Sequence, residues 1–177
     1  MTRRRLLWAT GALAALVLLA GRWMTGLYTD YLWFASLGAR EVWRARALAG
    51  ASVVAGTFLV AFLFTFANLY AVRRSVVSLV LPRRLANIEI GEEVPGRYLT
   101  MAVALLSATV AAVLAMGSDH WSQALLATGG KSFRESDPYF GADLGFFVYW
   151  LPFEMAMHAW TAILVISVSG LVVLLYA

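Results

Sequence analysis

The chain has 177 residues, of which 62% are hydrophobic and 14% charged, with a mean hydropathy of +0.76. So few polar side chains could not cover a soluble globule of this size, which excludes a water-soluble domain. The net charge is +4 with no cysteine, which leaves no means for a disulfide framework, a thiolate metal site or a cysteine nucleophile.

Four apolar windows are long enough to cross a bilayer, which requires about 20 residues of helix. None alternates apolar with polar residues, and backbone groups in lipid must bond within their own segment, so helices are predicted. The predicted fold class is an all-α membrane protein with about four transmembrane helices and interfacial aromatic-rich loops. We expect a single helical membrane domain over residues 1–177, with spans at about 6–24, 47–72, 98–116 and 153–177.

Basic residues beside these windows predict the topology, because cytoplasmic loops carry an excess of arginine and lysine. A cytoplasmic N-terminus places eight basic residues inside and six outside, with the contrast clearest between the second connection and the third. We therefore expect a multi-pass membrane protein with a cytoplasmic N-terminus. The first window could instead be a cleaved signal peptide with a twin-arginine-like start, but it lacks a clear cleavage site, which favours a retained anchor.

Two connections between the windows have distinct compositions. The first holds six aromatic residues that suit the headgroup level, which predicts a re-entrant or in-plane segment there: Trp23, Tyr28, Tyr31, Trp33, Phe34 and Trp43. The stretch 73–96 contains four arginines and two prolines, and reads as a short amphipathic piece and a turn at anionic headgroups. A short interfacial helix is expected at 121–127.

Small residues at four-residue spacing predict where helices pack closely. In the second window these are Ser52 and Gly56; in the third they form two stripes, Ala104, Ala108 and Ala112, and Ser107, Ala111 and Ala115. The phenylalanines that follow Gly56 are bulkier, and we expect them to face lipid, pigment or a partner subunit.

Two loop patterns suggest ligand chemistry only weakly. The run Gly129-Gly-Lys-Ser132 ends like a phosphate-binding loop but lacks the earlier glycine, since position 125 is leucine, so we predict a turn and no nucleotide. The acidic residues of the third connection have no calcium-loop spacing and predict a solvated loop, in which Asp137 starts a turn and Asp143 caps the next segment.

His158 lies four residues after Glu154 near the start of the last window, so the two share a helix face. The histidine could bind a haem or chlorophyll-type pigment, or form a polar pair with Glu154 in a proton path. An interfacial structural pair is the favoured interpretation, because water is close to a helix end. The sequence requires no cofactor.

Two motifs carry a family resemblance. The run YLWFASLG at 31–38, with Val42, Trp43 and Arg46 after it, and the run DPYFGADLGFFVY at 137–149, with LPF at 151–153, resemble the uncharacterised protein family 0182 of bacterial integral membrane proteins. The resemblance implies a protein of the bacterial inner membrane, and it favours the N-terminal membrane portion of a longer protein. The alternative is a shortened member that docks on a partner. The resemblance implies no catalytic residues.

The sequence holds no nucleophile elbow, HExxH helix or dinucleotide fingerprint, so no enzyme activity is predicted. The leading hypothesis is a non-catalytic accessory subunit that packs on a larger bacterial membrane complex, respiratory or photosynthetic. The alternatives are the membrane module of a transport or export protein with a missing extracytoplasmic domain, and pigment binding through His158. Expected partners are lipids and other integral membrane subunits, with no nucleic acid and no nucleotide.

Overall fold

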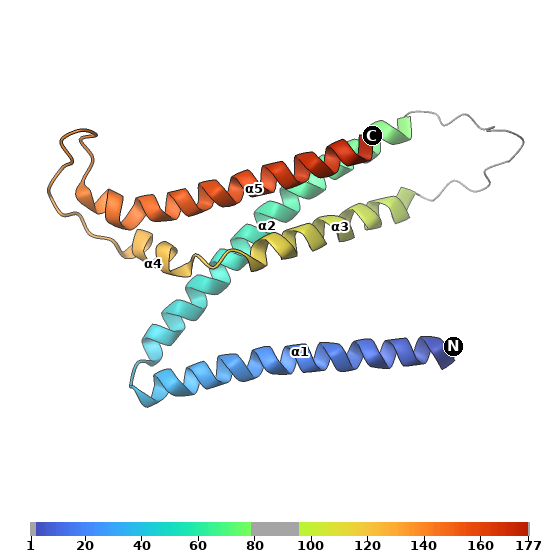
Figure 1. Cartoon of the computed structure of the whole chain (residues 1–177), viewed down its shortest axis with the longest axis horizontal. Coiled ribbons are helices and arrows are strands. Elements are labelled where there is room, and N and C mark those ends of the chain that lie inside the picture. The colour runs from blue at the N-terminus through green and yellow to red at the C-terminus, as the bar shows by residue number, and fades with distance from the viewer. Residues whose placement is uncertain (1–2, 79–95, 177) are drawn as a thin grey trace, which may run out of the picture. The chain divides into compact units, whose positions relative to one another are not determined.

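The computed structural model describes residues 3–78 and 96–176, and these form helices joined by loops (Figure 1). The described part contains no β-strand, only an isolated bridge between Ser136 and Asp143. In chain order the elements are α1 (Arg3–Ser36), α2 (Arg40–Ser78), α3 (Gly96–Met116), α4 (Trp121–Gly129), the π-helix η1 (Phe146–Trp150) and α5 (Leu151–Tyr176). The predicted all-α class is therefore confirmed.

The chain divides into two compact units, Met1–Leu48 and Ala49–Ala177. The first unit contains α1 and the start of α2, joined by a tight turn. Gly38 takes φ +70, while its N–H bonds to Ala35 O at 3.1 Å and the next N–H, of Ala39, bonds to Phe34 O at 2.9 Å. This pair of bonds ends α1 as a Schellman motif, in which glycine accepts the left-handed conformation without strain.

Contacts across this turn hold the two helix ends of the first unit together. The rings of Tyr31 and Trp43 meet edge to face with centroids 5.2 Å apart, and Arg46 lies 3.8 Å from the Asp30 carboxylate. The aromatic residues predicted to form a re-entrant or in-plane segment thus belong to α1 and the start of α2. No break separates a segment there, because α1 continues to Ser36.

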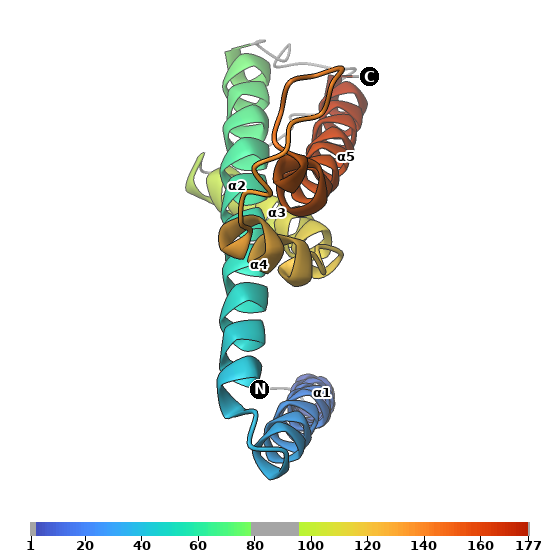
Figure 2. The same ribbon diagram turned by 90° about the vertical axis from the view of Figure 1, so that its left-hand side faces the viewer.

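The second unit has its core where α2, α3 and α5 pack together (Figure 2). Ala61 of α2 and Ala111 of α3 are fully buried against a ridge of larger side chains from α5: Trp160, Leu164 and Val168. The two alanines let the backbones approach, and the α5 side chains fill the space between them. The Trp160 indole N–H donates to Leu114 O at 3.2 Å.

A buried polar contact ties α2 to the end of α3. The hydroxyls of Thr57 and Ser118 lie 2.9 Å apart, and both residues are buried. Each hydroxyl also has a backbone acceptor, Val53 O at 2.8 Å for Thr57 and Ala115 O at 2.6 Å for Ser118. One hydroxyl can therefore donate across the interface while the other donates to its own helix.

Three helices of the described residues are long and apolar enough to cross a membrane: Arg40–Ser75, Gly96–Met116 and Phe146–Tyr176. They contain the second and third predicted windows, and the fourth as far as Tyr176. The sequence predicted about four spans. The first window, 6–24, lies within α1, which is not among these three, so a fourth span stays a prediction.

The short elements partly match expectation. The helix predicted at 121–127 is confirmed as α4. The amphipathic piece predicted within 73–96 lies mostly outside the described residues, although α2 itself continues to Ser78. The π-helix η1 was not predicted. Its last hydrogen bond runs from Leu151 N–H to Phe146 O, immediately before Pro152, which has no N–H to continue the ladder.

Candidate functional site

A network of hydrogen bonds lies in the 132–145 loop, which connects α4 to η1 in the second unit (Figure 1). The Asp143 carboxylate accepts four hydrogen bonds from it. Oδ2 accepts from Ser132 Oγ at 2.5 Å and from Arg134 N at 3.1 Å. Oδ1 accepts from Gly145 N at 2.7 Å and from Phe133 N at 3.1 Å. One carboxylate thus holds both ends of the loop.

These bonds alter the acidity of Asp143. The Ser132 hydroxyl, above all, lowers the pKa of this carboxyl below its ordinary value of 3.8; partial desolvation opposes it, and the N–H groups of Phe133, Gly145 and Arg134 lower it further. Each donor favours the ionised form because it bonds to the charge. Asp143 is therefore ionised at neutral pH and accepts from all four donors. We call Asp143 and these four donors the loop frame.

The tip of the loop is a compact turn built on Asp137. Its Oδ1 accepts from Tyr139 N at 3.0 Å and Phe140 N at 2.8 Å, and Gly141 N donates back to Asp137 O at 2.9 Å. Gly141 takes φ +66, which favours glycine. The turn predicted at Asp137 is confirmed, and it leaves the Tyr139 and Phe140 side chains 89% and 80% exposed.

The base of the loop packs tightly against η1. The rings of Phe133 and Tyr149 stack with centroids 5.7 Å apart. A Cβ added at Gly130 would lie 2.6 Å from Tyr149 Cβ, and one at Gly145 would lie 2.6 Å from Lys131 O. Because real Cβ atoms essentially never come this close, both positions need glycine for close approach. Where the sequence predicts a turn at Gly129-Gly130, α4 continues to Gly129 and Gly130 is extended.

The two polar residues singled out in the last window do not bond to each other. Glu154 Oε1 accepts from the Trp150 indole N–H at 2.6 Å, so it ties the start of α5 back to η1. His158 is exposed one turn later. Within residues 3–78 and 96–176 no ion pair joins it to Glu154, and no group of three metal-ligating side chains occurs there.

The residues predicted to mediate packing differ in their surroundings. Ala104, Ala108 and Ala112 are half-buried, whereas the other stripe of α3, Ser107, Ala111 and Ala115, is fully buried. Ser52 and Gly56 are exposed, and a Cβ at Gly56 would meet no atom within 4 Å. The second unit therefore buries one small-residue face of α3 and leaves that of α2 open.

Sequence reasoning missed the partnership of Asp143 with Ser132, which are eleven positions apart. The sequence predicts a solvated acidic loop, because the spacing of its acidic residues matches no calcium-binding loop. One local signal was available for this loop. Asp137 and Asp143 each accept a hydrogen bond from the backbone N–H two residues later, as aspartates do in Asx-turns.

A model of the uncharacterised protein family UPF0182 matches residues 7–177. A UPF0182 protein of Mycobacterium tuberculosis (strain ATCC 25177 / H37Ra) is 32% identical over 168 residues, covering 93% of this chain and 17% of the relative. One from Synechococcus sp. (strain JA-3-3Ab) is 34% identical over 172 residues, covering 97% of this chain and 17% of the relative. No solved structure is significantly similar.

The chain thus spans about a sixth of the length of the curated relatives that it matches, since the alignments cover 17% of each. The matched region includes both sequence motifs and the 132–145 loop. On this match over nearly its whole length, the chain belongs to the uncharacterised protein family UPF0182.

Proposed function

We propose that this chain is a non-catalytic membrane module that docks onto further protein through the tip of the 132–145 loop. The observation that carries the proposal is the pair of aromatic side chains, Tyr139 and Phe140, which are 89% and 80% exposed on a turn held by Asp137. Aromatic residues dominate protein interfaces energetically, and a preformed turn avoids the entropic cost of ordering on binding.

The loop frame supports this assignment because its hydrogen bonds fix the conformation of the loop that carries Tyr139 and Phe140. Every donor to Asp143 is a backbone N–H or the Ser132 hydroxyl, so the carboxylate organises the loop itself. Hydrogen bonds that support a loop from behind in this way position its exposed side chains accurately for recognition.

The spans have surface left for further helices. Only 11% of the most apolar window of α2 and 17% of that of α3 is buried. Lipid covers part of such surface, but the open small-residue face at Ser52 and Gly56 is suited to close approach of another helix. Because the relatives are about six times as long, the docked protein can belong to the same polypeptide or to a separate subunit.

The membrane arrangement is part of the proposal. A bacterial inner-membrane protein with a cytoplasmic N-terminus and four spans agrees with the arginine distribution. It places the 132–145 loop outside and the 79–95 connection in the cytoplasm. Since the sequence has no cysteine, single cysteines at Thr2, Arg84 and Glu135 can be labelled from each side, and labelling of Glu135→Cys from the cytoplasm only would contradict this topology.

The docking proposal is tested by site-specific photo-crosslinking in native membranes. A photoreactive residue at 139 or 140 is expected to crosslink to protein, and the same residue at the exposed Glu135 far less. Intact mass then tells whether the crosslinked partner is a separate chain, in which case the adduct is heavier, or a distant part of the same chain.

The variant Tyr139→Ala/Phe140→Ala, without a photoreactive residue, should lose the co-purifying partner under mild detergent extraction. The matched control, Tyr139→Phe/Phe140→Tyr, keeps both rings and should retain it. Crosslinks to lipid alone, or equal partner yield from both variants, would show that the loop tip is not a docking element.

A further inference from the structure

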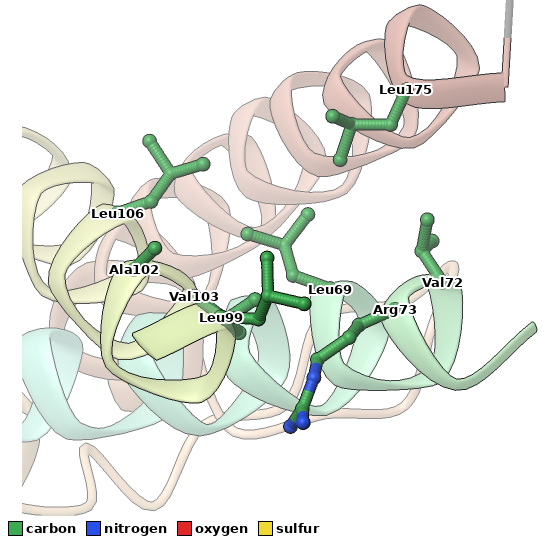
Figure 3. A pocket seen from close by; sticks show the side chains of 8 residues that line it. All are labelled: Leu69, Val72, Arg73, Leu99, Ala102, Val103, Leu106 and Leu175. Atoms are coloured by element: carbon green, nitrogen blue, oxygen red, sulfur yellow. The ribbon is translucent and has the colours of Figure 1, made fainter. Parts of the chain in front are cut away.

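A pocket of 340 Å³ opens between α2, α3 and α5 in the second unit, near the end of α2 and the start of α3 (Figure 3). Its lining is almost entirely hydrocarbon, with Leu69 and Val72 from α2, Leu99, Val103 and Leu106 from α3, and Leu175 from α5. Ala102 of α3 also lines the pocket and, with its small side chain, fills little of its volume. This volume lies at the lower end of the range of small-molecule sites, about 300–1,000 Å³.

One charged side chain, Arg73, borders this apolar space, and its guanidinium points away from Leu175 (Figure 3). The guanidinium is held in place by neutral groups: Nη1 donates to Thr100 Oγ1, and Nη2 donates to Gly96 O at 2.7 Å. The guanidinium carbon lies 5.6 Å from the centre of the Tyr70 ring. Arg73 is thereby fixed at the edge of the pocket rather than free in solvent.

The positive charge of Arg73 has no carboxylate partner within 4 Å among the residues that the structure describes. The helices around the pocket offer none nearby, because residues 49–78, 96–118 and 155–176 contain no aspartate or glutamate. Arg74 and Arg97 add two more positive charges at the same helix ends. A guanidinium has five N–H donors, so Arg73 keeps donors for an anion after its two bonds.

We propose that this pocket, the Arg73 pocket, holds an acyl chain of an anionic phospholipid whose phosphate pairs with Arg73. The hydrocarbon lining is complementary to the chain. The fixed guanidinium, which has no carboxylate partner among the described residues, is complementary to the headgroup charge. Arg73 lies two residues before the end of the candidate span Arg40–Ser75, where a headgroup meets the apolar core. This inference goes beyond the docking function and does not depend on it.

The test measures lipid retention by native mass spectrometry of the purified full chain, with phosphatidylglycerol and phosphatidylcholine as the probes. The wild type should prefer phosphatidylglycerol at least about fivefold, roughly what one arginine contributes at an anionic surface. Arg73→Gln should abolish the preference, while Arg74→Gln, the same charge change on an exposed neighbour outside the pocket lining, should retain most of it.

A second pair of variants tests the apolar part. Ala102→Phe fills the pocket from an exposed position, and should reduce binding of both lipids; Ala67→Phe adds the same ring at an exposed position of α2 outside the lining, and should not. Circular dichroism and gel filtration verify that each variant is folded. Equal binding of the two lipids by the wild type, equal loss in Arg73→Gln and Arg74→Gln, or undiminished binding by Ala102→Phe would each overturn the proposal.

Discussion

Replacing Gly130 by alanine should destabilise the base of the 132–145 loop, whereas the same replacement at the adjacent Gly129 should not. Gly130 has φ −63 and ψ 146, a conformation that alanine adopts without strain, so the backbone carries no penalty. The cost is steric: the new Cβ would lie 2.6, 2.7 and 2.8 Å from Cβ, Cγ and Cδ2 of Tyr149. At Gly129 a Cβ meets nothing within 4 Å.

The magnitude follows from this overlap. Carbon atoms pack best at about 3.5–4.0 Å, so the Tyr149 ring must retreat by roughly 1 Å, and its stack on Phe133 blocks one direction. Overpacking of this kind costs about 1–3 kcal/mol. Each glycine-to-alanine change also restricts the unfolded chain, which stabilises by about 0.4–1 kcal/mol. That gain is common to both variants, so their difference should be the steric term of about 1–3 kcal/mol.

Hydrogen exchange of the 131–149 amides in nanodiscs, read by mass spectrometry, measures the local opening free energy of each variant. Gly130→Ala should exchange faster than wild type in the loop and in η1, with no change in the α2 and α3 core. Gly129→Ala should exchange at the wild-type rate or more slowly. Equal protection of the loop in the two variants would refute the packing argument, since it would mean that Tyr149 moves aside freely.

The remaining predictions concern the loop frame and the helix core. Because the folded-state pKa of Asp143 is lowered, its stabilisation is present above the ordinary value of 3.8 and is lost as pH falls through the folded pKa. The protection of the loop amides, measured relative to their intrinsic exchange rate at each pH, should therefore be unchanged between pH 7 and 5 and fall only below about 4; a loss of protection already at pH 6 would contradict the assignment. Asp143→Asn should expose the loop amides to exchange at neutral pH, because the amide NH₂ would face an N–H donor. In a double-mutant cycle of unfolding in mixed micelles, Thr57→Val and Ser118→Ala should couple by about 0.6 kcal/mol and not above roughly 1.7 kcal/mol; independent effects would show that their 2.9 Å contact does not stabilise. Trp160→Phe should cost about 0.5–1.5 kcal/mol in the same assay, since it keeps a ring in the core but loses the bond to Leu114 O; no loss would remove that bond from the interactions that hold α5.

Local patterns in the sequence predict the individual elements well. The apolar windows lie within helices, the Asp137-Pro138 pair starts a turn, and the piece at 121–127 is a helix, because each depends on residues within a few positions of one another. The boundaries were less predictable. The first span is predicted to end near residue 24, because polar and aromatic residues follow it. In the structure α1 includes these residues and ends at Ser36. The π-helix ahead of Pro152 had no recognisable periodicity.

Long-range partnerships could not be predicted in this way. The frame of Asp143 requires the chain to reverse so that Ser132 and Gly145 reach one carboxylate, and nothing in the spacing specifies that reversal. The Arg73 pocket likewise combines three helices, and Leu175 is over a hundred residues from Arg73.

Composition and hydropathy alone indicate that the chain is helical and suited to a membrane, because every backbone group within lipid must be hydrogen-bonded and the apolar windows show no strand-like alternation. The sequence also places two stripes of small residues on α3, either of which could accept a neighbouring helix. The packing of the folded chain selects one of them: Ser107, Ala111 and Ala115 are buried, while Ala104, Ala108 and Ala112 remain half-buried. The two stripes offer nearly the same side-chain volume at the same spacing, so the choice depends on where α2 and α5 lie, which no local pattern encodes.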